Sequence, residues 1–324
     1  MPSLTYLTFT LNDLPSVLPN LERLAAVVDE SVVVDSSHPD HVRRWEGEVT
    51  RRGGRIVRVL PLCASDLLRP FAIAHVRSER VIELDSDEEP SPGLVDRLRH
   101  LGERDAYVVP RYEIQLRAFT AHLRLYRPAT LRFVGPSCAF PQVEGSLGAL
   151  HRNEHILHHA NYQRYFAERG RPERYLFLEA IQRPYTREYL QEAATVRLEK
   201  RRIVPFWLER LLGDLDVPLG DAGIELGLLL RFVQDALLRG GWQWARFQRR
   251  YELAKRAYIG ALDPADRAAQ YRLATEIRRA GGLIQYLRLT DVDRLARLTS
   301  EFDWTHSGPE VLQRLLAERQ KVGS

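Results

Sequence analysis

The sequence contains few cysteines and no long apolar run. Cys63 and Cys138 are the only two cysteines in 324 residues. They match neither a CxxC pair nor a zinc spacing, so we expect no disulfide framework and no structural zinc site. No apolar run approaches the roughly 18 residues of a membrane-spanning helix. The first residues lack the basic start and apolar stretch of a signal peptide, and we therefore expect a cytoplasmic protein.

Lysine is almost absent. The chain has Lys200, Lys255 and Lys321, so 44 of the 47 basic residues are arginine. This bias is typical of GC-rich coding, and it weakens the interpretation of each arginine as a phosphate contact. The net charge of +4 is modest, and acidic and basic residues alternate along the helical segments instead of clustering with aromatic residues. Nucleic acid is therefore not an expected partner.

Three common catalytic motifs are missing. The segment T-L-N-D-L-P follows the first predicted strand where a dinucleotide-binding domain has GxGxxG. No GxxxxGK[ST] phosphate loop and no GxSxG nucleophile elbow occurs. Dehydrogenases, P-loop NTPases and the commonest α/β serine hydrolases are therefore disfavoured.

Hydrophobic residues make up 44% of the chain, which excludes disorder as its main state. The first 110 residues alternate β-branched runs with amphipathic segments, the pattern of a mostly parallel sheet. We predict strands over 4–10, 31–34, 56–60 and 81–84. We predict helices over 14–28, 40–52 and 66–77, and a further helix opened by Pro90 and Pro92.

The pattern changes along the second half. Short strand-like pieces between residues 106 and 134 give way, after Gly145, to segments rich in Leu, Arg, Glu and Ala with helical periodicity. We find no internal repeat and no low-complexity tract. The sequence predicts an α/β domain over 1–145 and a mainly helical region over 146–324.

Polar residues follow the predicted strands. Because ligands of open parallel sheets lie at the carboxyl ends of the strands, these side chains should line one edge: Asn12, Asp13, Asp35, Asp66, Asp85 and Asp87. Asp85-Ser86-Asp87 is the most informative group, since two aspartates one residue apart suit Mg²⁺ or Mn²⁺. The alternative is an acidic helix start, where the same residues act as caps.

Four segments in the N-terminal half match one family in order and position. Phe9-Thr10-Leu11-Asn12-Asp13 is similar to its T-Y-N-E loop, and Val33 to Asp40 to its V-D-S-x-S-x-D segment. Arg69 stands where the family has A-R-N, although Pro70 replaces the asparagine, and Leu84 to Glu88 matches its D-x-D-E motif. The chain thus resembles the family 2 nucleotide-sugar glycosyltransferases with a glycosyltransferase-A fold, of the bacterial lipopolysaccharide-core or natural-product type.

The resemblance implies an inverting transferase that uses Mn²⁺ or Mg²⁺ and a nucleoside diphosphate sugar. It implies that Asp35 hydrogen-bonds the nucleobase and that Phe9, Thr10 and Leu11 lie around the base pocket. It implies that Arg69 faces the diphosphate, the alternative being an ordinary arginine on a helix surface. The remaining donor-site and metal residues it implies are Asp85, Ser86 and Asp87, with a third metal contact from His158 or His159.

The catalytic base is less clear from the sequence. The family often has a His-Glu pair a few residues after the glycine at position 135, but Cys138 stands near the place of that histidine. We predict Glu144 as the general base, the alternative being an exposed loop glutamate. His155 and His159 would lie one turn apart on a helix, as metal-ligating histidines can.

The C-terminal half predicts an association surface. Leucines recur at helical spacing over 224–240, and an aromatic group around Trp242 and Trp244 follows. Residues 224–260 should bury this stripe against the catalytic domain or a second subunit, and we favour a homodimer. Any membrane contact would be peripheral. The acceptor is unknown. Two other functions stay open: a nucleotidyltransferase of similar fold and a non-catalytic helical adaptor.

Overall fold

The computed structural model describes residues 3–62, 64–115, 117–134, 140–159, 264–306 and 308–323. Residues 1–178 and 276–324 form one compact unit, and residues 179–275 form a second. The sheet and the candidate site lie in the first unit.

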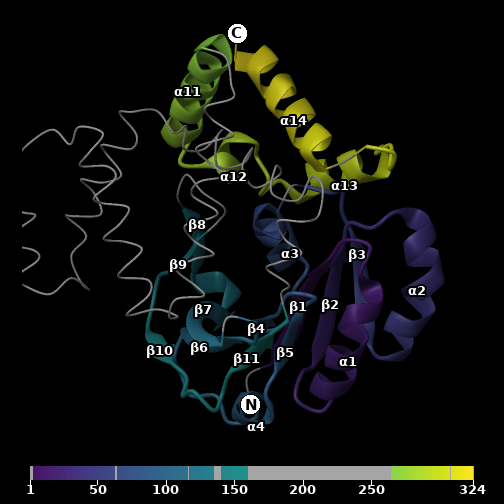
Figure 1. Cartoon of the computed structure of the whole chain (residues 1–324), viewed down its shortest axis with the longest axis vertical. Helices are drawn as coiled ribbons and strands as arrows, with labels where there is room; N and C mark the ends of the chain where they lie inside the picture. Colours follow the sequence, from purple (N-terminus) through teal and green to yellow (C-terminus); the bar gives the residue numbers. More distant parts are fainter. Residues whose placement is uncertain are drawn as a thin grey trace, which may run out of the picture. The chain divides into compact units, whose positions relative to one another are not determined.

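Strands and helices alternate along the first 83 residues (Figure 1). The order is β1 (Leu4–Thr10), α1 (Leu14–Leu24), β2 (Glu30–Asp35), α2 (Pro39–Arg51), β3 (Gly54–Arg58), the 3₁₀ turn η1 (Ser65–Leu68), α3 (Arg69–Ala74) and β4 (Arg80–Glu83). The predicted strand over 4–10 has the observed bounds.

Shorter strands follow. They are β5 (Glu88–Pro90), β6 (Ala106–Glu113), β7 (Ala118–Tyr126), β8 (Leu131–Val134), β9 (Phe140–Val143), β10 (Leu147–Ala149) and β11 (Ile156–His158), with helix α4 (Pro92–Leu98) after β5 and the turn η2 (Pro128–Thr130) after β7. The described C-terminal elements are all helical: α11 (Pro264–Arg279), α12 (Leu283–Tyr286), α13 (Val292–Ser300) and α14 (Gly308–Gly323).

One sheet organises this unit. Its strand order is β3-β2-β1-β4-β7-β6-β11-β5, with β10 also paired to β6. Strands β1 to β4 are parallel, while β7 runs antiparallel to both of its neighbours and β5 antiparallel to β11. The predicted α/β class with a mostly parallel sheet is confirmed.

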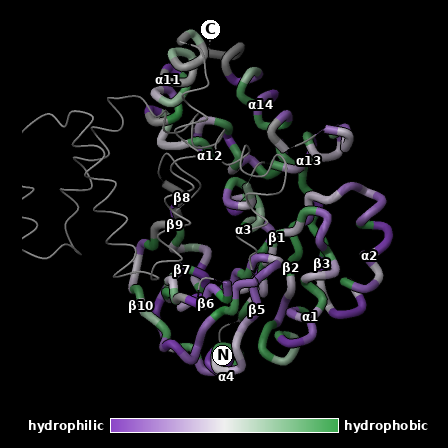
Figure 2. The backbone as a smooth tube through the Cα atoms, viewed as in Figure 1, coloured by the Kyte–Doolittle hydropathy of each residue, from purple (hydrophilic) through white to green (hydrophobic). Residues whose placement is uncertain are grey.

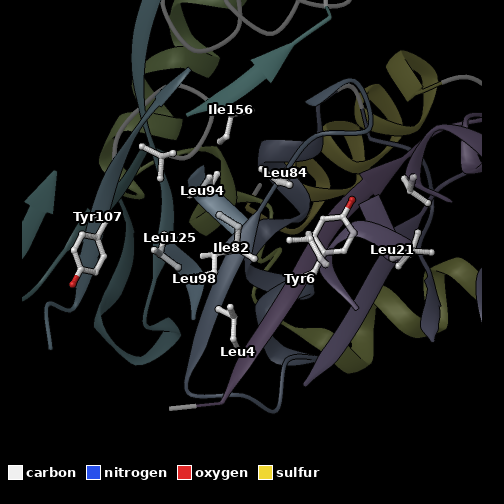
Figure 3. Packing of buried hydrophobic residues seen from close by; sticks show 14 of the residues in the cluster. Leu4, Tyr6, Leu21, Ile82, Leu84, Leu94, Leu98, Tyr107, Leu125 and Ile156 are labelled. Carbon is white, nitrogen blue, oxygen red and sulfur yellow. The ribbon is translucent and has the colours of Figure 1, made fainter. Parts of the chain in front are cut away.

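Helices bury both faces of the parallel part, and every residue of β1 is buried accordingly. On one face, alternate residues of β1 and β4, such as Tyr6 and Ile82, join Leu125 of β7 and the apolar stripes of α1, α2 and α4 (Figure 3). Helix α1 supplies Leu14, Val17, Leu21 and Leu24 at three- and four-residue spacing. The outward residues of α2 are mainly hydrophilic, as Figure 2 shows.

Helix starts follow from local chemistry. The Ser91 side chain accepts a hydrogen bond from the Leu94 amide, and Pro92 occupies the first turn of α4, where a missing N–H costs nothing. The predicted helix start at Pro90 is wrong, because Pro90 ends β5. The predicted helix over 66–77 is interrupted, since Pro70 lies in the first turn of α3 and a 3₁₀ turn precedes it.

The expected helix around the histidines is also wrong. His158 lies in β11, and His155 and His159 flank this strand, so the two do not share a helical turn. The leucine stripe, the aromatic group and both cysteines fall outside the described residues. In the part of the chain that the structure describes, no helix is long and apolar enough to cross a membrane.

Candidate functional site

Three polar residues form a row at the carboxyl ends of neighbouring strands. Thr10 of β1 is the register partner of Asp35 in β2, and Asp35 is the register partner of Arg58 in β3. Residues opposite one another in parallel strands point to the same face. The row therefore brings three side chains together from segments that are far apart in sequence.

Asp35 is fully buried and holds this row together. Its Oδ1 accepts hydrogen bonds from the hydroxyls of Thr10 at 2.6 Å and Ser37 at 2.5 Å. Its Oδ2 accepts from the Ser37 amide at 3.1 Å and pairs with the Arg58 guanidinium. Four donors thus saturate the carboxylate predicted to bind a nucleobase.

The loop after β1 is fixed to the loop after β2. Asn12 has a φ of 58°, a left-handed conformation that asparagine tolerates better than most residues. Its amide donates to Ser37 Oγ at 2.6 Å, and its Oδ1 accepts from the His38 amide at 3.1 Å. Within this loop region Phe9 is buried, whereas Leu11 is exposed.

The acidic segment Asp85-Ser86-Asp87 forms a tight turn between β4 and β5. The Asp85 amide donates to Glu88 Oε2 at 2.9 Å, and the Glu88 amide donates to the Asp85 carbonyl at 3.0 Å. The turn leaves Ser86 half-buried and the Asp87 side chain 38% exposed. Asp87 is therefore the more accessible of the two carboxylates, because the Asp85 side chain is only 33% exposed.

Arg124 of β7 lies behind this turn and is buried. Its guanidinium pairs with Asp85, with Glu83 at 2.9 Å and with Glu88 at 2.8 Å. Burial alone would raise the pKa of Asp85, but the positive charges of Arg124 and Arg69 outweigh that effect and lower it to about 2. Asp85 is therefore ionised throughout the physiological range.

Further ion pairs extend the group into what we call the ionic cluster. Arg69 pairs with Asp66 and with Glu83 at 2.8 Å, so its guanidinium is already engaged by carboxylates. Arg111 pairs with Glu88 at 2.9 Å and with Glu113 at 2.6 Å. The cluster contains three arginines and six carboxylates: Arg69, Arg111, Arg124, Asp66, Glu83, Asp85, Asp87, Glu88 and Glu113. It carries a formal excess of three negative charges.

His158 joins this cluster from β11. Its Nδ1 lies 2.5 Å from Glu113 Oε2, and its Nε2 lies 3.5 Å from Asp87 Oδ2. Burial alone would lower the pKa of His158, but the hydrogen bonds with Asp87 and Glu113 outweigh it and raise the pKa to about 9. The excess of carboxylates thus favours a positive charge beside Asp87.

No protein-family model and no curated protein matches this sequence. Solved structures that are similar to it include the following three. Residues 1–349 of S. aureus TarS align over 92% of this chain and 90% of that one, at 13% identity and a TM-score of 0.42. A mannosyltransferase from Pyrobaculum calidifontis, in complex with GDP-Man and Mn²⁺, aligns over 85% of this chain and 86% of that one, at 15% identity and a TM-score of 0.39.

The third is glucosyl-3-phosphoglycerate synthase from Mycobacterium tuberculosis, in complex with Mn²⁺, UDP and glucosyl-3-phosphoglycerate. It aligns over 55% of this chain and 80% of that one, at 15% identity and a TM-score of 0.36. The chain spans 41% of a mycobacterial protein and 55% of the longer TarS chain that it also matches.

The side chains around Asp87 fit one kind of divalent-cation site, in which the protein supplies few of the ligands. Among the described residues no group of three or more His, Cys, Asp and Glu side chains is arranged to hold a metal ion. Mg²⁺ in phosphate-transfer sites, however, takes only one or two protein carboxylates and completes its shell with water and substrate phosphates. Asp87 suits that kind of site, and the nearby Nε2 of His158 can join it only in the neutral imidazole, so its proton would leave as the cation binds. The surplus negative charge of the cluster favours a cation there.

Glu144 lies in a different environment. Its side chain is 55% exposed and pairs with Arg132 Nε at 2.6 Å, while its amide donates to the Thr130 carbonyl at 2.8 Å. No contact joins Glu144 to the ionic cluster among the interactions of the described residues. His159 is half exposed and lies 3.4 Å from Glu89.

Sequence reasoning missed the arginines and glutamates of β6 and β7. Arg111, Glu113 and Arg124 are charged residues within otherwise largely apolar strands, and charges placed inside strands in this way are a signal of a buried polar face. Only the spatial pairing shows that they surround Asp85. A cavity of about 160 Å³ lies elsewhere, lined by residues that include Leu60, Phe302 and Leu315, and it contains none of the predicted site residues.

Proposed function

We propose that the chain is a metal-dependent glycosyltransferase that moves a sugar, with inversion, from a nucleoside diphosphate sugar to an acceptor. The observation that carries the proposal is the accessible Asp87 beside His158, at the edge of a cluster with excess negative charge. The motifs shared with family 2 transferases at the ends of β1, β2 and β4 support it.

In this proposal Asp87 and the neutral form of His158 would hold the cation at the acidic turn, next to Asp85, which Arg124 orients. When bound, the cation offsets the negative charge that develops on the departing nucleoside diphosphate. Arg124 keeps Asp85 ionised and fixed, so that the turn needs no rearrangement when the diphosphate arrives.

The acceptor must lose a proton as it attacks the anomeric carbon. Glu144 is the proposed general base for this step, as an exposed carboxylate in the loop after β9. The attacking atom is oxygen, nitrogen or sulfur. Residues 1–145 bind the donor in this proposal, and residues 146–324 bind the acceptor and a second copy of the chain.

A thermal-shift panel tests the donor site. UDP, GDP, dTDP, CDP and ADP are each added to the full chain with and without Mn²⁺. At least one diphosphate should raise the melting temperature, and Mn²⁺ should enlarge the shift, because a ligand that binds only the folded state stabilises it according to its occupancy. If none shifts melting with Mn²⁺ present, the donor-site proposal is wrong.

A product assay separates the two enzyme classes. Incubation with nucleoside diphosphate sugars should release the nucleoside diphosphate and give a glycosylated acceptor. Release of pyrophosphate from a nucleoside triphosphate and a sugar phosphate would instead identify a nucleotidyltransferase.

A further inference from the structure

Arg58 is the accessible member of the row formed with Thr10 and Asp35. The Asp35 side chain is fully buried, whereas that of Arg58 is 28% exposed. Since four donors already saturate the Asp35 carboxylate, a ligand arriving at this edge would meet the guanidinium rather than the aspartate.

The Arg58 guanidinium has more N–H donors than its two hydrogen bonds use. It carries five N–H groups. Nη1 pairs with Asp35 and Nη2 donates to the Ser37 carbonyl at 2.6 Å. Those two bonds fix the plane of the group and leave three N–H groups without an acceptor in the described part of the chain.

The C-terminal segment covers Arg58 from one side. The Arg58 guanidinium carbon lies 4.4 Å from the centroid of the Trp304 ring, within the range of a cation–π contact. The same segment is anchored two residues after Arg58, because the Leu60 amide donates to Thr299 Oγ1 at 3.0 Å. Asp35 on one side and Trp304 on the other therefore hold Arg58 in one orientation.

We propose that Arg58 contacts the nucleobase of the donor and selects bases with a carbonyl oxygen on their outer edge, with Asp35 and Trp304 as its positioning residues. The inference rests on the donor site proposed above. Uracil and thymine present O4 and guanine presents O6 and N7, all of which accept hydrogen bonds from an arginine fork. Cytosine and adenine present amino groups at the same places, and an amino group facing a guanidinium leaves donors unpaired on both sides.

Binding constants with the full chain test this inference. UDP, GDP, CDP and ADP are titrated by calorimetry in the presence of Mn²⁺ against wild type, Arg58→Gln and Arg58→Lys. Wild type should bind at least one of UDP and GDP roughly ten- to hundredfold more tightly than CDP and ADP, the discrimination typical of one bidentate contact. Arg58→Gln should reduce that ratio to near one, and Arg58→Lys, which keeps the charge but not the planar fork, should reduce it in part.

Arg55→Gln is the matched control. Arg55 lies in the same strand, is 38% exposed and pairs with Glu30 at 2.6 Å, away from the Thr10–Asp35–Arg58 row. It should leave the base ratio unchanged. Trp304→Ala should lower the ratio and Trp304→Phe should retain it, because phenylalanine keeps a ring face for the guanidinium.

The outcomes separate this inference from the proposed function. If Arg58→Gln binds all four diphosphates with the wild-type ratio, or weakens all of them equally, Arg58 does not read the base and the donor site still stands. A wild-type preference for ADP or CDP would also overturn the inference. If no diphosphate binds wild type with Mn²⁺, both the donor site and the inference fail.

Discussion

Arg124 and Asp85 form an ion pair across 39 residues of sequence, and the same guanidinium also holds Glu83 and Glu88. The buried Arg124 guanidinium therefore pairs with three carboxylates. The acidic turn is thereby tied to β7 as well as by the hydrogen bonds within it.

Removal of the Arg124 guanidinium should destabilise the fold. Arg124→Gln leaves buried carboxylates without their partner, and we expect the free energy of unfolding to fall by about 3–5 kcal/mol. Chemical denaturation measures it. Arg132→Gln, which breaks the exposed Arg132–Glu144 pair, is the control and should cost less than about 1 kcal/mol. Equal losses in the two variants would contradict the central role of Arg124.

Asp87→Ala should abolish the effect of the metal and preserve the fold. The Asp87 side chain is 38% exposed, and within the described part of the chain its side-chain ion pair is the 3.5 Å approach of His158, so the melting temperature of the free protein should change little. The extra thermal shift that Mn²⁺ gives with a diphosphate should disappear. Asp96→Ala, an exposed acid on α4, should keep it. An undiminished Mn²⁺ effect in Asp87→Ala would remove Asp87 from the metal site.

Glu144→Gln should separate binding from turnover. Loss of a general base typically lowers kcat by about 10²–10⁴-fold. Diphosphate binding should be unchanged, because in the described residues Glu144 pairs with Arg132 and not with the ionic cluster. Steady-state kinetics and calorimetry on the same preparation measure both. Turnover at the wild-type rate would mean that another group takes the proton from the acceptor.

His122 should make stability depend on pH. Burial lowers the pKa of His122 to about 3, and the charges of Arg111 and Arg124 act in the same direction. The unfolded chain binds this proton near pH 6.5 while the folded chain does not, so acidification below pH 6.5 favours unfolding. The contribution is at most about 1.4 kcal/mol per pH unit for one proton, lost progressively between pH 6.5 and 3.

Urea denaturation of wild type and His122→Gln at pH 7, 6 and 5 checks this prediction. The variant should lose less stability on acidification than wild type does. His151→Gln, at an exposed position, should behave as wild type. Identical pH dependence in wild type and His122→Gln would show that His122 is not held neutral.

Local pattern was sufficient to predict the alternation of strands and helices from β1 to β4, apart from the break between η1 and α3, because the apolar pattern of each element lies within its own segment. It failed at β5 and β11. Each has three residues, and their pairing joins Pro90 to Ile156, so no local signal distinguishes either from a turn or a helix start. The prediction of His158 near the acidic turn depended on the family resemblance, and its place in a strand was visible only in the structure.

The same limit applies to Asp35 and Arg69. The edge position of Asp35 followed from the strand pattern and the choice of Arg69 from the family resemblance, but the sequence could not show that their charges are already matched. Arg58 stands 23 residues after Asp35 and Glu83 stands 14 after Arg69. Partner choice at such separations is set by strand register and helix packing, which only the assembled sheet defines.

The hydrogen bond between Leu60 and Thr299 joins residues 239 positions apart in the sequence. During synthesis it can form only after Thr299 has been added to the chain. At roughly 5–20 residues per second, a ribosome needs about 12–48 seconds to add the residues between them. During that interval the nascent chain contains β1, β2 and β3 with Asp35 and Arg58, but no Trp304 to cover the guanidinium. The edge of the sheet with Thr10, Asp35 and Arg58 is therefore among the last parts of the protein to be completed, even though its strands are the first to be synthesised.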